Sequence, residues 1–458
     1  MNATHLADRV VEYDSTLQPH RTRLRQAISL VSLVLAVWHL VRAVGIRILE
    51  EELNTRGQAF DGGQQCPVCG RFMESKGLKS RRMLTLLGWV SWRRRIRTCS
   101  PACAIGQIVP SDESLDIVPS QQTSWEVQRL ACLLTIVVPF ALARDVLCQL
   151  TGVSVCPKTV WNWVQDWGAL AMEQFQEHLT ALTAGEPPRE DAMSDEDHAL
   201  PLLLGADGVM VPFRPEAGTA RGKTRWREVK VGILARLKRT VSQTGKPVCR
   251  LVRRRLVAVL GDIDALQPRL WGEALRQGIL TTKRVIWLSD GGRGFWRLFR
   301  DQFAPYAEGI LDFYHAAQNV WKGAKAWLDG RTSQAQTWFA TARHRLRHGD
   351  ADAVLDDLNV ALALEELPPA VRQTLSNLSE YLTTHREHID YARWKEAGLP
   401  IGSGMVESAC KWLIQQRFKG VGMRWSEDGF NHVLHLRLLW ANGRLDDLFA
   451  FDSNYPLN

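Results

Sequence analysis

Three short apolar runs in the second half of the chain constrain its fold more than any other feature. They span Leu202–Ala206, Val285–Ser289 and Gly309–His315, and the first two are followed at once by Asp207 and Asp290. Runs of this length without a polar alternation are typical of strands buried on both faces. Helical patterns separate and follow the runs, so we predict an α/β sheet covered by helices on both sides.

The length of the chain requires more than one structural unit. With 458 residues, 45% of them hydrophobic, the chain can form about two to four units. We expect a multidomain α/β protein in which helical, cysteine-rich and helix-turn-helix-like segments precede the sheet. The expected boundaries are 1–55 for the N-terminal helical segment, 60–110 for the cysteine module, 124–184 for the helix-turn-helix-like segment, 185–199 for an acidic linker, 200–315 for the first part of the core, 316–397 for an all-helical segment and 398–450 for the C-terminal helices of the core.

The basic residues of this chain are clustered. The formal net charge is +8 and the pI is about 9.1. Nine basic residues and one acid lie between Cys66 and Cys103, and thirteen basic residues and one acid lie between Arg221 and Arg255. A single run of this kind is usually a solvated face. Two runs favour a polyanionic partner, most simply nucleic acid.

One N-terminal stretch, Ile28–Leu49, is apolar enough to suggest a membrane span. Its uninterrupted apolar part is short because His39, Arg42 and Arg47 break it, and a bilayer requires about 20 apolar residues. No signal-peptide pattern is visible. We therefore predict an amphipathic or buried helix and no membrane partner.

Four of the nine cysteines form two close pairs, Cys66 with Cys69 and Cys99 with Cys103. Four thiolates suit a closed tetrahedral Zn²⁺ site, and zinc would stabilise a module too small to hold itself together. The alternative is four unliganded thiols, since the second pair is one residue wider than the commoner Cys-x-x-Cys spacing. The others lie in apolar contexts and fit buried thiols in a reducing cytosol: Cys132, Cys148, Cys156, Cys249 and Cys410.

A structural zinc would present the arginines of this module to DNA phosphates. Contacts of that kind position a protein on DNA without reading its sequence. The arginines are Arg81, Arg82, Arg93, Arg94, Arg95 and Arg97.

Sequence reading is expected from a second segment. A helix over 141–150, a turn at Thr151–Ser154 and a helix that begins at Pro157 have the outline of a helix-turn-helix, although an ordinary helical hairpin has the same outline. Lys158 and Asn162 are the side chains expected to reach the DNA, with Gln165 exposed beside them. Trp161 and Trp163 are expected to be core residues.

A third acid, Glu407, lies on a helix predicted to begin after Gly402-Ser403-Gly404. An apolar stripe of this helix can pack on the sheet, and Glu407 borders the stripe. Because functional groups gather at the carboxyl ends of strands, the helix could point Glu407 at Asp207 and Asp290. Taken singly, each aspartate could instead be a turn or helix cap. The stripe consists of Val406, Ala409, Cys410 and Leu413.

Three carboxylates held together repel one another unless a cation lies between them. Hard divalent ions with oxygen ligands fit that role, Mg²⁺ first and Mn²⁺ as a substitute. Two such ions about 4 Å apart could activate the attacking oxygen and stabilise the leaving oxygen of a phosphodiester displacement. The acids Asp207, Asp290 and Glu407 are thus the predicted metal ligands and catalytic residues.

Five segments in order give the chain a family resemblance. It resembles the ISKra-type insertion-sequence transposases, a bacterial group related to Mutator-like DDE enzymes, over roughly residues 60 to 447. The segment around Glu407 is the most specific. The matching segments are Gly205–Gly208, Trp287–Gly292, Asp312–His315, Leu399–Ser408 and Lys419–Trp425.

The resemblance implies an RNase H-like core split by an all-α insertion, with Asp207, Asp290 and Glu407 as its acidic triad. It implies hydrolysis at the ends of a mobile element, followed by attack of the freed 3′-hydroxyl on target DNA. The Asp312-x-x-His315 element would then support the site, although both residues could simply brace the end of a strand. Double-stranded DNA, both terminal inverted repeats and target, is the implied partner of a homo-oligomer in the bacterial cytoplasm.

Two other functions fit part of the pattern. A regulator derived from a transposase would bind DNA without catalysis, although the presence of all three acids argues against it. An RNase H-like nuclease would cut without joining, although two DNA-binding segments favour a protein dedicated to element ends.

Overall fold

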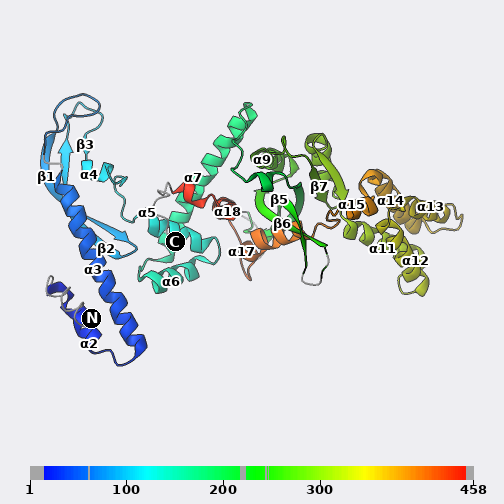
Figure 1. Cartoon of the computed structure of the whole chain (residues 1–458), viewed down its shortest axis with the longest axis horizontal. Helices are drawn as coiled ribbons and strands as arrows, with labels where there is room; N and C mark the ends of the chain where they lie inside the picture. Colours follow the sequence, from blue (N-terminus) through cyan, green and yellow to red (C-terminus); the bar gives the residue numbers. More distant parts are fainter. Residues whose placement is uncertain (1–14, 60–61, 217–222, 243–244, 246, 450–458) are drawn as a thin grey trace. The chain divides into compact units, whose positions relative to one another are not determined.

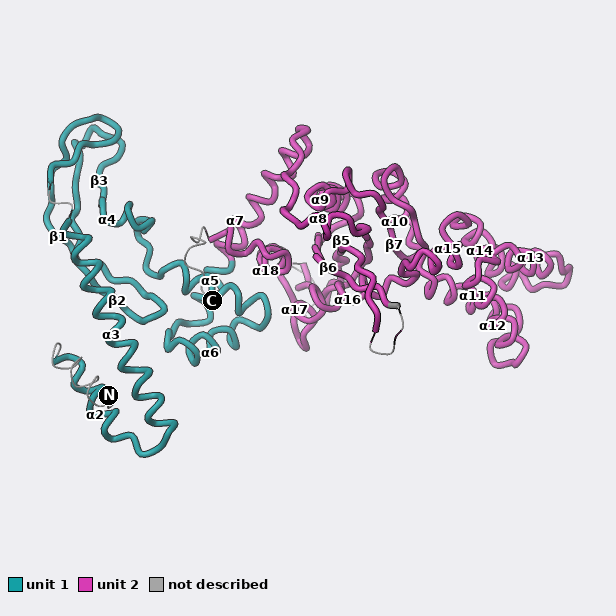
Figure 2. Tube along the Cα trace, in the orientation of Figure 1, with its two compact units in different colours: residues 1–164 teal, residues 165–458 magenta. Residues whose placement is uncertain are grey.

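The computed structural model describes residues 15–59, 62–216, 223–242, 245 and 247–449. It divides into two compact units, Met1–Val164 and Gln165–Asn458 (Figure 2). The predicted core lies in the second unit, and the cysteine module lies in the first.

The first unit is built on one long helix. Its chain order is η1 (Ser15–Leu17), α2 (Gln18–Arg25), α3 (Leu30–Ala59), β1 (Glu74–Thr85), β2 (Gly88–Thr98), β3 (Gln107–Ile108), α4 (Pro110–Glu113), α5 (Trp125–Thr135), α6 (Phe140–Thr151) and the start of α7 (Pro157–Thr183) (Figure 1). The three strands form an antiparallel sheet in the order β1-β2-β3. Apolar side chains of this sheet and of α3 form one small core: Met83, Val90 and Trp92 with Ile46, Leu49 and Leu53.

The predicted N-terminal helix is present, but most of its apolar surface is exposed. Helix α3 is long and apolar enough to cross a membrane by length and composition, with a mean hydropathy of 1.7 over its most apolar window and 11% of that window buried. Its second half packs on β2, where Glu50 and Asn54 accept hydrogen bonds from the backbone N–H groups of Ser91 and Arg93. Of the two predicted alternatives, an amphipathic or a buried helix, the buried helix is wrong, because Ala36, Leu40 and Gly57 are the buried residues of α3.

The second unit contains a mixed five-stranded sheet. Its strands are β4 (Leu202–Phe213), β5 (Arg225–Val241), β6 (Pro247–Leu260), β7 (Val285–Ser289) and β8 (Ala307–Leu311), in the order β6-β5-β4-β7-β8. Strands β4, β5 and β6 pair antiparallel, and β7 and β8 run parallel to β4. Helix α8 (Asp195–His198) precedes the first of these strands, and α9 (Ile263–Arg276), α10 (Arg293–Leu298) and the π-helical turn η2 (Phe299–Phe303) lie among them.

Helices cover both faces of this sheet, and two glycines show how closely. Gly205 and Gly232 lie one residue out of register on β4 and β5, so they face opposite sides of the sheet. A Cβ on Gly232 would lie 2.8 Å from Leu270 of α9, and one on Gly205 would lie 2.6 Å from Val406 of the C-terminal helix. The prediction of a sheet covered on both sides is confirmed.

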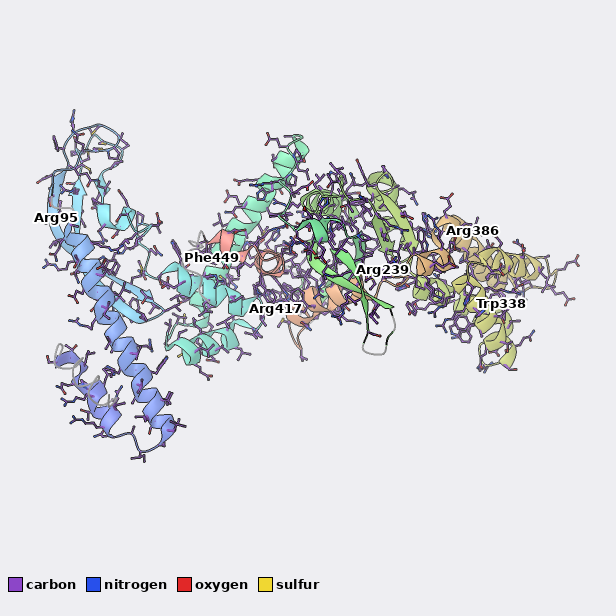
Figure 3. All side chains as sticks on the ribbon, viewed as in Figure 1. Arg95, Arg239, Trp338, Arg386, Arg417 and Phe449 are labelled. Atoms are coloured by element: carbon purple, nitrogen blue, oxygen red, sulfur yellow. The ribbon has the colours of Figure 1, made fainter. Side chains whose placement is uncertain are left out.

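Helices alone make up the chain between β8 and residue 397 in the part that the structure describes. They are α11 (Phe313–Leu328), α12 (Ser333–Arg347), α13 (Ala351–Leu362), α14 (Pro369–Thr384), η3 (Arg386–His388) and α15 (Tyr391–Glu396). Arg386, which is labelled in Figure 3, donates two hydrogen bonds to the Asp352 carboxylate, at 2.8 and 2.7 Å. Leu375, Tyr391 and Trp394 belong to the same hydrophobic core as Trp287 of the sheet. The direct contact with the sheet is made by η3, where the His388 ring lies 3.1 Å from the Gly309 carbonyl oxygen of β8.

The C-terminal helices return to the sheet. They are α16 (Gly404–Ala409), the π-helical turn η4 (Cys410–Gln415), α17 (Gln416–Phe418), α18 (Glu427–Ala441) and α19 (Leu445–Leu448). The predicted apolar stripe at Val406, Ala409, Cys410 and Leu413 is buried. The predicted cap of α18 is also present, since the Ser426 hydroxyl accepts a hydrogen bond from the Gly429 backbone.

Two element boundaries differ from the sequence prediction. Strand β4 continues past Asp207 to Phe213, because β5 still pairs with it after its pairing with β7 has ended at Leu204. The third apolar run stops being a strand at Leu311, because Asp312 caps helix α11 by accepting a hydrogen bond from the backbone of His315.

Adding one methyl group at Gly205 should lower the free energy of unfolding. In Gly205→Ala the new Cβ would lie 2.6 Å from Val406 and 2.7 Å from the Leu288 carbonyl oxygen, so we expect a loss of about 1–3 kcal/mol in the free energy of unfolding. Gly404→Ala is the matched control, since nothing lies within 4 Å of its Cβ position. Urea denaturation of both variants measures the difference, and equal stabilities would contradict the packing of α16 on β4.

Candidate active site and metal-binding cluster

Strand register sets the positions of the two aspartates. The last Cα pair between the parallel strands β4 and β7 is Leu204 with Trp287. Asp207 and Asp290 each lie three residues beyond that pair, toward the same end of the sheet. Both side chains are partly buried. The two acids thus emerge side by side although strands β5 and β6 and helix α9 separate them along the chain.

Helix α16 brings Glu407 into the electrostatic range of these aspartates. Burial raises the pKa of Asp207, and the charges of Asp290 and Glu407 raise it further, while a 2.6 Å hydrogen bond from the Gly208 backbone and the charge of His315 oppose the rise. Glu407 itself is exposed and lies 3.5 Å from Lys411, one turn further along the helix. The acids predicted to act together therefore repel one another in this structure.

The acids are not packed as tightly as ligands around a bound ion. Among the residues that the structure describes, only the four cysteines bring three or more potential ligand atoms within 4.8 Å of one another. Asp207, Asp290 and Glu407 form a wider arrangement. A divalent ion would have to draw Glu407, the most exposed of the three, toward the aspartate pair.

A buried carboxylate fixes the start of the glutamate's helix. One oxygen of Asp312, a side chain 2% exposed, accepts hydrogen bonds from both the backbone N–H and the hydroxyl of Ser403, the residue before α16. Its other oxygen caps α11, and its backbone N–H donates to the Ser289 carbonyl at the end of β7. Asp312 therefore joins β7, α11 and α16 at one point.

The partners of Asp312 keep it ionised. Burial favours its neutral form, but hydrogen bonds from His315 and Ser403 outweigh burial and lower its pKa to about 2. The His315 imidazole lies 3.4 Å from this carboxylate. Hydrogen bonding to Asp312 raises the pKa of His315 against the effect of burial, and the charges of Asp290 and Glu407 raise it further. His315 thus lies close to Asp312 and within electrostatic range of Asp290 and Glu407.

Sequence reasoning left three features of this site unassigned. Ser403 was seen only as part of a glycine-rich entry to the helix, although it is the partner of Asp312. Lys411 carried no signal beyond its spacing of four residues from Glu407. A cavity of about 990 Å³ also adjoins α16, and its lining includes Arg254, Trp412 and Ser408, the residue after Glu407.

Replacing Asp312 should cost more stability than replacing an ordinary helix cap. Asp312→Ala removes a cap and leaves the buried N–H and hydroxyl of Ser403 without their acceptor, so we expect a loss of about 2–4 kcal/mol. Asp350→Ala is the matched control, because Asp350 caps α13 through the backbone of Ala353 without a comparable second contact, and its loss should be about 1 kcal/mol. Denaturant unfolding compares them, and equal losses would contradict a special role for the Ser403 contact.

The four predicted cysteines form one cluster in the first unit. Their sulfur atoms all lie within 4.8 Å of one another, with Cys66 and Cys103 at 3.6 Å and Cys69 and Cys99 at 3.4 Å. Zn–S bonds of about 2.3 Å in a tetrahedron require sulfur separations of about 3.8 Å. The wider spacing of the second pair therefore does not prevent its two sulfurs from joining the first pair, and the cluster could hold a metal ion.

Two chain turns shape this cluster. In the first, the backbone N–H of Cys69, and then that of Val68, point at the Cys66 sulfur and lower the pKa of that thiol to about 6. In the second, a hydrogen bond from the Cys103 backbone to the Ser100 carbonyl closes the turn. Amide groups aimed at sulfur favour thiolates, which are the form that binds zinc.

We expect the purified protein to contain an equimolar amount of zinc. Cys66→Ser and Cys69→Ser should each lose most of this zinc, because each removes one of four ligands. Cys156→Ser is the control, since this exposed cysteine lies outside the cluster. Elemental analysis measures the content, and zinc retained in both cluster variants would exclude the site.

The arginines of the cysteine module divide into two groups. Arg81 and Arg94 form ion pairs at 3.2 Å with the buried carboxylate of Asp112, and Arg97, 3% exposed, donates to the Gly62 carbonyl. Arg95 is half-buried and donates to Ser75. The exposed arginines of the predicted set are Arg82, stacked on Trp89, and Arg93.

The predicted helix-turn-helix has the expected local geometry. Helix α6 ends at Gly152, whose φ of 70° allows the sharp turn before α7. Lys158 and Asn162 are exposed near the start of α7, and Lys158 lies 3.4 Å from the centre of the Trp161 ring. Trp163 is buried, but Trp161 is 37% exposed, so the prediction of a core position is wrong for Trp161. Gln165 is half-buried and bonded to His432.

No family model and no curated protein matches this chain. One solved structure, the Drosophila P element transposase strand transfer complex, aligns with 73% of this chain and 96% of its own chain at 12% sequence identity. The TM-score of that alignment is 0.35. A score this low establishes neither a common fold nor a common activity.

Proposed function

We propose that this protein is a metal-dependent DNA transposase in which Asp207, Asp290 and Glu407 perform the chemistry. The observation that carries the proposal is the convergence of three acids from distant parts of the chain. Strand register directs Asp207 and Asp290 to the same end of the sheet, and the Asp312–Ser403 contact ties the start of the glutamate's helix to the residue that follows β8. Burial and the charges of Asp290 and Glu407 raise the pKa of Asp207, and a carboxyl perturbed in this way by its neighbours is characteristic of functional sites.

The residues at this site fit divalent metal ions. All three donors are carboxylates, which suit Mg²⁺ or Mn²⁺, and a cation would offset the repulsion that raises the pKa of Asp207. Bound ions would supply Lewis-acid activation of water or of a 3′-hydroxyl. The chain's own part is to hold the three acids at one end of the sheet. His315 positions the acids through charge and, with Asp312, supports the site.

The sheet supports an RNase H-like core for this function. Three antiparallel strands, β6, β5 and β4, continue into two strands parallel to β4, which is the arrangement expected of such a core. The helices from α11 to α15 then form its all-α insertion. The insertion shares a hydrophobic core with the sheet, so it can support α16.

The exposed basic groups support a double-stranded DNA partner. Arg82 and Arg93 in the cysteine module, with Lys158 and Asn162 on α7, are available to phosphates and bases. Arg254 is exposed in the cavity next to α16, where Trp412 provides an aromatic surface. We infer from the sequence resemblance that the DNA comprises the terminal inverted repeats and the target of an ISKra-type insertion sequence, in the cytoplasm of a bacterium.

The proposal predicts separate effects on chemistry and binding. Asp207→Ala, Asp290→Ala and Glu407→Ala should each reduce 3′-end cleavage and strand transfer by at least about 1,000-fold, because each removes a metal ligand. All three should bind DNA with the wild-type affinity. Asp301→Asn is the control, since it neutralises an exposed acid on η2 away from the site.

The assay uses element-end oligonucleotides with Mg²⁺ or Mn²⁺ and measures cutting and joining separately. Full activity in any of the three alanine variants removes the site assignment. Cutting without joining by the wild type indicates a nuclease instead. DNA binding without either reaction, across both metals, indicates a regulator.

A further inference from the structure

The exposed face of α3 carries a heptad pattern. From Leu30 to Ile48, apolar residues recur along this face at alternating intervals of four and three residues. This is the spacing of the a and d positions of a coiled coil. Val34, Val41 and Ile48 occupy the a positions, so every a residue is β-branched. The complete set, called the α3 seam from here on, is Leu30, Val34, Val37, Val41, Val44 and Ile48.

The α3 seam is not used by the packing of the first unit. At about 100° per residue, the residues that contact the β-hairpin, Ile46, Leu49 and Leu53, project from the opposite side of the helix. The side chains of the seam other than half-buried Val44 are 43–76% exposed. Exposed apolar surface of this regularity marks an interaction site.

We infer that α3 pairs with the α3 of a second copy of this chain as a parallel two-stranded coiled coil. Two parallel strands are favoured by β-branched residues at a with leucine at d. The a positions of the seam and Leu30 at its first d position fit this pattern, whereas Val37 and Val44 at the other two d positions add nothing to it.

Charge favours the same register, because Arg47 lies at a g position and Glu52 at the e position that follows. These two side chains are 55% and 54% exposed, and each is paired within its own helix, Arg47 with Glu50 and Glu52 with Arg56. In a parallel pair they also face each other across the interface.

The area of the seam is sufficient for a stable pair. Val31 and Leu33 flank it and are also exposed. With these two, seven exposed apolar residues per helix at roughly 100 Å² each would bury on the order of 1,400 Å² in total, within the range of about 1,200–2,000 Å² found for specific interfaces.

A bilayer suits this helix less well than a second copy. Its second half is bound to β2 through Glu50 and Asn54, and the Arg42 guanidinium donates to the Leu87 carbonyl at 2.9 Å. Polar side chains that are bound to the β-hairpin therefore lie on the same helix as the seam, within a few turns of it. A spanning helix needs apolar surface on all sides over its whole length.

The test is the oligomeric state of the full chain without DNA, measured by sedimentation equilibrium. The wild type should be a dimer, and Val41→Asp should raise the dissociation constant at least about 100-fold, because each dimer loses two buried valines and gains two charges at the interface. Leu35→Asp is the matched control, since Leu35 is 51% exposed on the same helix but lies off the seam. It should leave the dimer intact, and zinc content and thermal unfolding confirm that all variants fold.

Orientation is tested by disulfide crosslinking. Val41→Cys should crosslink two full-length chains rapidly, because a parallel pair places each a residue opposite itself, whereas Leu35→Cys should not exceed the wild-type background. A monomeric wild type, a trimer, or a dimer that survives Val41→Asp would overturn the inference. So would flotation of the wild type with phosphatidylglycerol vesicles that Leu35→Asp abolishes. None of these results depends on DNA cleavage, so the transposase proposal stands or falls separately.

Discussion

The buried carboxylate of Asp312 is the interaction on which the candidate site depends. It lies where the parallel strands end, and it accepts hydrogen bonds from the first turn of α11 and from Ser403 at the start of α16. Desolvation of a charge is costly unless several donors satisfy it, and here the donors come from segments that are far apart in the chain. The carboxylate therefore stabilises only the arrangement in which these segments meet, which is the arrangement that brings Glu407 toward Asp207 and Asp290.

The helices between β8 and α16 help to fix the position of Glu407. A long excursion of the chain would leave the position of Glu407 poorly fixed if its helices packed only on one another. Instead Leu375, Tyr391 and Trp394 pack in the same core as Trp287 and Phe313. The helical segment is thus continuous with the sheet, and dense packing transmits position from the sheet to α16.

Composition alone suggests that the whole basic run of the first unit faces a partner, but some of these residues are bound inside the unit. Part of the basic run is structural, because Arg81 and Arg94 neutralise the buried Asp112. The run has nine basic residues, so enough charge remains on Arg82, Arg93 and their neighbours for a polyanionic partner. Helix α3 likewise serves two purposes, since one face holds the hairpin and the opposite face bears the heptad pattern.

The sequence by itself determined the types of element and the chemistry they carry. Continuous apolar runs specified buried strands, the 3.6-residue stripe specified how α16 faces the sheet, and two cysteine pairs specified a four-sulfur cluster, because each of these patterns is local. Only the tertiary structure decided where strand β4 ends, that Asp312 binds Ser403, and which arginines are turned inward. Those outcomes depend on partners distant in the chain, such as β5, α16 and Asp112, and no local period encodes a contact between residues that meet only after folding.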